Sequence, residues 1–107
     1  MPALSDRQRR LGLHLPVSVS GRDVSGAPFA EATRSLNVSG GGICFESRQN
    51  LQPGLHITVH VELPRELRRY FAGRPVFRAR AVVCRVERFE GQAVSRVGAR
   101  FLGEIEA

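Results

Sequence analysis

The sequence has 107 residues, a length that predicts one small domain with one hydrophobic core. Its 42% hydrophobic and 24% charged residues exclude a disordered composition, and no apolar run approaches the ~20 residues that a membrane-spanning helix needs. The formal net charge of +6 favours an anionic partner, such as nucleic acid, an anionic lipid surface or a phosphorylated small molecule.

All 16 basic residues are arginine. A guanidinium group can hold a phosphate, or the O6/N7 edge of guanine, with two hydrogen bonds. A GC-rich coding sequence favours arginine over lysine without any selection on the protein, however. Only the positions of particular arginines therefore count as evidence for a binding site.

Residues 1–17 contain no continuous apolar segment and no small-residue cleavage site, which predicts a cytoplasmic protein without a signal peptide. The two cysteines, Cys44 and Cys84, lie in apolar, strand-like runs and are too few for a disulfide framework. We expect both to be small buried residues of the core.

The first ten residues are polar and charged, and they carry three arginines, Arg7, Arg9 and Arg10. We expect a flexible arginine-rich arm over residues 1–10, followed by a single domain over residues 11–107. The domain opens with alternating apolar and polar residues, which predict a half-buried strand over residues 13–20. Pro16 lacks a backbone N–H, so this is an edge strand or the start of a strand.

Alternation and turn residues predict further strands over residues 30–38, 43–47, 55–63, 76–89 and 92–102. Pro64 and the helix formers after it predict a short helical insertion near residues 64–72. No long C-terminal helix is expected after the last strand. The predicted fold class is therefore all-β, with six antiparallel strands. A barrel is favoured over a sandwich because closure removes exposed edge strands.

Neither a metal site nor a catalytic site is expected. His56 and His60 share one face of a predicted strand, but at ~3.4 Å per residue they lie well over 10 Å apart, too far for one metal ion. Ser39 has no histidine or cysteine partner at a motif spacing, and the acidic residues show no paired arrangement. We therefore expect a protein that is not an enzyme.

The stretch Asn37-Val38-Ser39-Gly40-Gly41-Gly42 allows two interpretations. It can be a tight turn, in which the Asn and Ser side chains cap the backbone and glycine supplies positive φ. It can also be a loop kept bare so that a ligand approaches the backbone N–H groups. In the second case the side chains of Asn37 and Ser39 lie on one side and can meet a base edge together.

These six residues fit the (Asp/Asn)-x-Ser-x-x-Gly motif of the PilZ domain, a bacterial receptor module for cyclic di-GMP, and the chain resembles that family over nearly its whole length. An apolar strand, "ICFES", follows the motif as it does in the family. The segments "RLGLHLPVSVSG", "NLQPGLHITVHVELP" and "VGARF" resemble the family's first, middle and closing strands.

The resemblance implies a six-stranded antiparallel barrel that binds the dinucleotide on its outer surface. In the family an Arg-x-x-x-Arg motif in the arm folds over the ligand, where one arginine holds a phosphate and another engages the Hoogsteen edge of guanine. The Asp/Asn and Ser of the other motif hydrogen-bond the guanine side. Carried onto this sequence, the expected ligand-binding residues are Arg7, Arg9, Arg10, Asn37, Ser39 and Gly42.

The arm departs from the family's pattern, because Arg10 directly precedes the first strand and Asp6 stands four residues before it. Two functions follow. In the first, Arg7 takes the missing role, and a stand-alone PilZ protein binds cyclic di-GMP and signals to an unidentified effector protein through a ligand-dependent interaction surface. In the second, a degenerate domain with weak or no nucleotide binding acts as a protein–protein adaptor in motility, secretion or exopolysaccharide control.

Binding of nucleic acid by a basic barrel ranks last. It needs aromatic platforms on which bases stack, and the sequence has six Phe, one Tyr and no Trp, mostly in core-like positions. No cofactor is expected besides the dinucleotide ligand, and a monomer and a homodimer are both compatible with the sequence.

Overall fold

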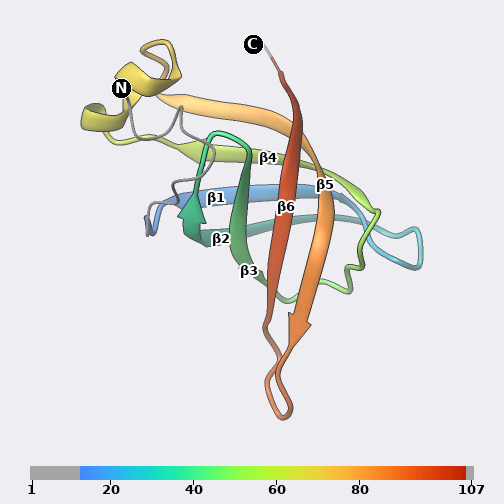
Figure 1. Ribbon diagram of the computed structural model, residues 1–107. Coiled ribbons are helices and arrows are strands. Elements are labelled where there is room, and N and C mark those ends of the chain that lie inside the picture. The colour runs from blue at the N-terminus through green and yellow to red at the C-terminus, as the bar shows by residue number, and fades with distance from the viewer. Residues whose placement is uncertain (1–12, 106–107) are drawn as a thin grey trace.

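The computed structural model describes residues 13–105, which form six β-strands and a short 3₁₀ helix (Figure 1). The predicted arm lies outside the described residues. The elements in chain order are β1 (Pro16–Arg22), β2 (Pro28–Val38), β3 (Gly42–Ser47), β4 (His56–Glu62), the 3₁₀ helix η2 (Arg65–Phe71), β5 (Val76–Arg88) and β6 (Ser95–Glu104). This order confirms the predicted all-β fold with a short helical insertion.

The strands close into an antiparallel barrel in the order β1–β2–β3–β6–β5–β4, with β4 pairing again with β1. In Figure 1, β1, β2 and β4 run horizontally and β3 and β6 run vertically, while β5 begins horizontally and then bends downward beside β6. Pro16 is the first residue of β1, so its missing N–H falls at the start of a strand. The predicted barrel is confirmed.

The core consists of the inward-facing side chains of the strands. Val19, Phe45 and Val59 are each 0% exposed, and burial of one such side chain stabilises the fold by about 1.5–3 kcal/mol. Leu51 is also 0% exposed, although it lies in the loop before β4, which the sequence identifies only as a turn. The loop therefore contributes to the core as well as reversing the chain.

The helical insertion covers part of the core. Leu67 and Phe71 of η2 pack against the core cluster, and the rings of Phe71 and Phe77 lie 5.0 Å apart. Phe77 in turn contacts Phe101 of β6 at 5.2 Å in an edge-to-face arrangement. This aromatic row attaches the insertion to the paired strands β5 and β6.

Two irregularities in strand pairing decide which residues face outward near the predicted motif. The register shifts between Ser35 and Asn37 on β2, and between Val83 and Arg85 on β5. Each shift inserts one extra residue, so two consecutive residues face outward before alternation resumes. Without the second shift, strict alternation would direct Arg85 inward together with Val83.

The same shift corrects one prediction. Cys44 is buried, as expected, but Cys84 is exposed. Cys84 is the extra residue between Val83 and Arg85, so it lies on the outside of the barrel although it directly follows the apolar pair Val82 and Val83. Local hydrophobicity did not reveal a register shift that depends on the partner strand.

Candidate functional site

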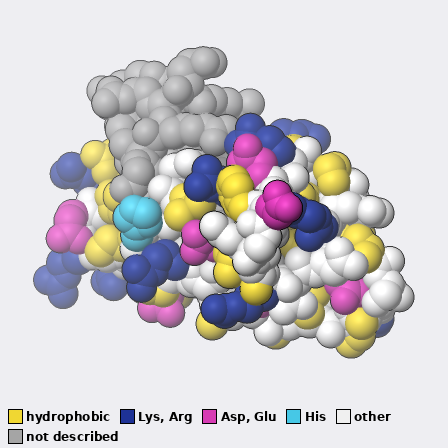
Figure 2. Space-filling model, turned by 90° about the horizontal axis from the view of Figure 1, so that it is seen from below, with side chains coloured by type: hydrophobic (Ala, Val, Ile, Leu, Met, Phe, Trp, Pro, Cys, Tyr) yellow, Lys and Arg dark blue, Asp and Glu magenta, His cyan; other side chains and the backbone are white. Residues whose placement is uncertain are grey.

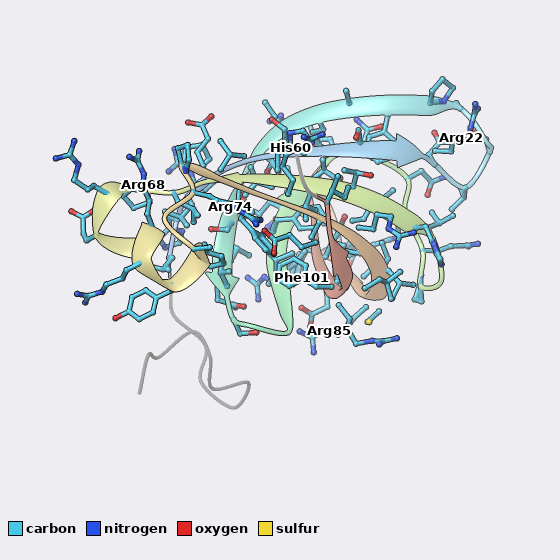
Figure 3. The ribbon with its side chains drawn as sticks, turned by 90° about the horizontal axis from the view of Figure 1, so that it is seen from above. Arg22, His60, Arg68, Arg74, Arg85 and Phe101 are labelled. Carbon is cyan, nitrogen blue, oxygen red and sulfur yellow. The ribbon has the colours of Figure 1, made fainter. Side chains whose placement is uncertain are left out.

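A pocket of about 340 Å³ lies on the outer surface of the barrel, between the loop that joins β2 to β3 and the strands β5 and β6. Its lining residues come from this loop, from the start of β3 and from β5 and β6: Ser39, Gly41, Gly42, Ile43, Cys84, Arg85, Gly98, Ala99 and Arg100. Figure 3 shows Arg85 on the outside of the barrel, on a different side from Arg22 and Arg68.

The pocket is hollow because glycines occupy outward-facing positions of neighbouring strands. Gly42 of β3 is opposite Arg100 of β6, and Gly98 of β6 lies between Cys44 of β3 and Arg85 of β5. A residue without a Cβ leaves the backbone open to close approach by a ligand. The arginines beside these glycines extend from the surface, so they border the hollow.

The predicted motif loop forms one side of this pocket, and its geometry is fixed by hydrogen bonds. The Ser39 backbone N–H donates to the Gly42 carbonyl at 2.9 Å, and the Gly41 N–H donates to Ser39 Oγ at 3.3 Å. The Phe101 N–H of β6 donates to the Gly41 carbonyl at 2.9 Å. Ser39, which is 6% exposed, therefore shapes the loop while its side chain borders the pocket.

Gly42 has a structural reason to be glycine. A Cβ at this position would lie 2.5 Å from the Ala99 carbonyl oxygen, a distance that backbone atoms cannot tolerate without moving. The described glycines with positive φ are Gly21, Gly26, Gly54, Gly73 and Gly91, so the motif glycines are not selected for a left-handed turn. The structure thus favours close packing over the positive-φ explanation.

Asn37 lies beside the pocket and does not line it. The bulge at the end of β2 directs its half-buried side chain to the outer face, opposite Cys44, while Val38 is 1% exposed in the core. The structure thus brings Ser39 and Gly42 together at the pocket and places Asn37 on the neighbouring row of the sheet. Arg7, Arg9 and Arg10 lie outside the described residues.

Sequence reasoning missed Arg85, Gly98 and Arg100. They lie in segments correctly predicted as strands, but their meeting with the motif loop depends on β3 pairing with β6 and β6 with β5. The "VGARF" segment resembles the family's closing strand and contains one signal. Its glycine and arginine, Gly98 and Arg100, are two residues apart and therefore share a face of the strand. Without the register, this signal could not be connected to the loop.

The other candidate sites give no cluster. His56 is exposed, and His60 Nε2 accepts a hydrogen bond from Arg78 Nε at 3.3 Å. Among residues 13–105, no three His, Cys, Asp or Glu side chains gather in a way that could hold a metal ion. Over the same range, no helix has the length and apolarity that crossing a membrane requires.

The arginines do not gather into one continuous patch on the face shown in Figure 2. Basic side chains are spread around this face, with acidic side chains among them. A surface that tracks a nucleic-acid backbone carries a stripe or groove of positive charge. This face therefore gives no support to the nucleic-acid hypothesis.

Comparison with known proteins agrees with this architecture. The sequence matches the PilZ domain family over residues 5–107, whereas no curated protein matches it. The fold is similar to that of the Bacillus subtilis inhibitor of motility (MotI/DgrA), with a TM-score of 0.64 and 20% sequence identity. The similarity covers 90% of this chain but 41% of that one, so this chain spans less than half of the other protein's length. With a family match over nearly all of its residues and the six-stranded barrel in place, the chain belongs to the PilZ domain family.

Proposed function

We propose that this PilZ domain binds cyclic di-GMP on the outer surface of its barrel and signals through a ligand-dependent protein-interaction surface. One observation carries the proposal: a single hollow is bordered by the motif residues Ser39 and Gly42 on one side and by two arginines, Arg85 and Arg100, on the other. Bare backbone beside short polar side chains leaves room for a purine ring, and guanidinium groups suit phosphates.

The arm supplies the second part of the proposed mechanism. Arg7, Arg9 and Arg10 immediately precede the segment that enters β1, so they can contact a ligand held at the pocket. Ordering of this arm on the ligand would change the surface that an effector protein meets. The domain would thus transmit a signal by binding alone, without catalysis, in the cytoplasm where the messenger acts. Motility is the first process to test, because the similar structure is named an inhibitor of motility.

Replacement of Asn37 tests the motif. Asn37→Ala is expected to weaken cyclic di-GMP binding about tenfold, because loss of hydrogen bonds to a base edge costs ~1–3 kcal/mol. Isothermal titration at fixed salt measures the change, and the melting temperature reports whether the variant stays folded. Asn50→Ala is the matched control, since Asn50 is an exposed asparagine in the loop before β4 and does not line the pocket.

If Asn37→Ala and Asn50→Ala both bind cyclic di-GMP as tightly as the wild-type protein does, Asn37 of the motif does not contribute to binding. Absence of any heat with wild-type protein at high ligand concentration would reject the receptor function. The adaptor function, which Asp6 in the arm favours, would then be the better explanation, and a partner should bind equally with and without the dinucleotide.

Cys84 offers an independent test of where the ligand lies. It is exposed and lines the pocket, whereas Cys44 is 3% exposed, so iodoacetamide should modify Cys84 selectively in the folded protein. Saturating cyclic di-GMP is expected to slow this alkylation several-fold by covering the thiol, as measured by intact-mass spectrometry over time. AMP at the same concentration should leave the rate unchanged. Equal rates with and without bound cyclic di-GMP would place the ligand away from this pocket.

A further inference from the structure

Within the described residues, the guanidinium groups of Arg85 and Arg100 have no partner, unlike those of Arg74, Arg78 and Arg88. Arg74 forms an ion pair with Glu104, Arg88 donates to the Leu51 carbonyl at 2.8 Å, and Arg78 donates to His60. Within residues 13–105, by contrast, the Arg85 and Arg100 guanidinium groups make no hydrogen bond or ion pair. Their donors are therefore available to a ligand.

The pairing of β5 with β6 determines the direction of the Arg85 side chain. The register shift after Val83 turns Arg85 outward, opposite Gly98. A Cβ on Gly98 would lie 3.8 Å from a terminal guanidinium nitrogen of Arg85, so this side chain lies over the glycine, at the pocket. A bulge and a glycine together direct one guanidinium to the hollow.

Arg100 reaches the same hollow from β6. Its partners across the sheet are Gly42 on one side and Val82 on the other, and neither carries a charge. The residues that line the pocket include both arginines and no acidic side chain. The positive charge at this site is therefore not compensated locally, which favours an anion there.

We propose that Arg85 and Arg100 are the phosphate-binding residues of the barrel surface, and that they supply from β5 and β6 the guanidinium contact that the arm lacks at Asp6. This assignment rests on the proposed binding of cyclic di-GMP. It makes affinity depend on two positions outside both family motifs, and it explains how a domain with an imperfect arm can still hold a dinucleotide.

The test compares Arg85→Ala and Arg100→Ala with Arg80→Ala. Arg80 is a matched control, because it is also an exposed β5 arginine opposite a β6 glycine, Gly103, and it lies outside the pocket. All three variants lose the same charge. Titration with cyclic di-GMP is expected to show about tenfold weaker binding or more for Arg85→Ala and for Arg100→Ala. For Arg80→Ala we expect a change of about twofold or less, because salt screens distant surface charges.

The salt dependence of binding gives a second measure that a purely structural role would not change. Each lost phosphate contact should make the plot of log affinity against log salt concentration less steep, and Arg80→Ala should leave the slope unaltered. Arg85→Lys and Arg100→Lys keep the charge and should recover part of the affinity and of the slope. Melting temperatures close to wild type are expected throughout, since all of these side chains are exposed.

The possible outcomes separate this assignment from the proposed function. If Asn37→Ala weakens binding but Arg85→Ala and Arg100→Ala behave like Arg80→Ala, the assignment is overturned and the receptor function stands. If wild-type protein binds no cyclic di-GMP, inorganic pyrophosphate serves as the probe, with the backbone amides of Gly42 and Gly98 followed by NMR. Shifts that disappear in Arg85→Ala and Arg100→Ala would support an anion site at this position, and their absence from wild type would overturn it.

Discussion

Gly42→Ala is expected to lower the free energy of unfolding by about 1–3 kcal/mol and to weaken ligand binding at the same time. The added Cβ would lie 2.5 Å from the Ala99 carbonyl oxygen. The two strands cannot separate easily there, because Gly42 pairs with Arg100 and its carbonyl accepts the Ser39 N–H. Relief of the clash must therefore disturb the pairing of β3 with β6, which forms the floor of the pocket. Urea denaturation and titration with cyclic di-GMP measure the two effects.

Gly98→Ala separates the packing effect from the ligand effect. Here the added Cβ would meet only the Arg85 side chain, at 3.8 Å or more, which is an ordinary van der Waals contact. Alanine also reduces the conformational entropy of the unfolded chain, so stability should stay near that of wild type or rise slightly. The methyl group nevertheless extends into the hollow and takes up space beside the Arg85 guanidinium. We therefore expect normal folding with weaker binding.

Together the two alanine variants distinguish two reasons for a glycine at a binding site. A wild-type urea midpoint for Gly42→Ala would show that the strands can adjust, and the structural explanation of this motif position would be wrong. Unchanged affinity for Gly98→Ala would show that the ligand does not enter the hollow between Arg85 and Arg100. Either result changes the description of the site without affecting the membership of the family.

Alternation of apolar and polar residues was sufficient to predict the strands and the all-β class. The pattern over residues 55–63 reappears as β4, with Ile57, Val59 and Val61 buried. Such a pattern is local, since side chains two apart share a face of the strand. The core could therefore be assigned without knowing which strands pair.

The candidate site could be predicted only in part, because it depends on pairing between distant strands. Ser39 and Gly42 were found because they lie together in one short motif. Arg85 was not found, because strict alternation would place its side chain inward with that of Val83. Only the register shift that pairs Arg85 with Gly98 directs the side chain outward. A bulge is a property of two strands, so a single sequence gives little sign of it.

Ser35 holds residues 13–15 against β2, and Ser35→Ala is expected to affect both stability and binding. Ser35 is 0% exposed, and its Oγ accepts the Leu15 N–H at 2.9 Å and donates to the Leu13 carbonyl. These contacts hold residues 13–15, which lead into β1, against β2 just two residues before Asn37. Alanine would leave the buried Leu15 N–H without a partner, which costs about 1–3 kcal/mol.

The effect on binding follows from the place of this contact in the chain. Residues 13–15 lie two residues after the arginine-rich arm, so a looser attachment here is expected to raise the entropy cost of contact between the arm and a ligand. We expect weaker cyclic di-GMP binding together with a lower urea midpoint. Faster hydrogen exchange of the Leu15 amide would locate the change. Ser18→Ala is the matched control, because Ser18 is an exposed serine of β1 and its hydroxyl makes no hydrogen bond within the described residues.

Three outcomes lead to different conclusions about how the arm acts. In the first, Ser35→Ala shows lower stability, faster exchange at Leu15 and weaker binding, and Ser18→Ala shows none of these changes. This result would mean that one buried hydroxyl holds the segment that joins the arm to the barrel. Lower stability with unchanged affinity would mean that the arm contributes to binding independently of this attachment, or not at all. A wild-type midpoint with unchanged exchange would contradict the role given to Ser35. In that case the placement of residues 13–15 would depend on other contacts, such as the Ser35 N–H donating to the Leu15 carbonyl at 2.9 Å, which alanine retains.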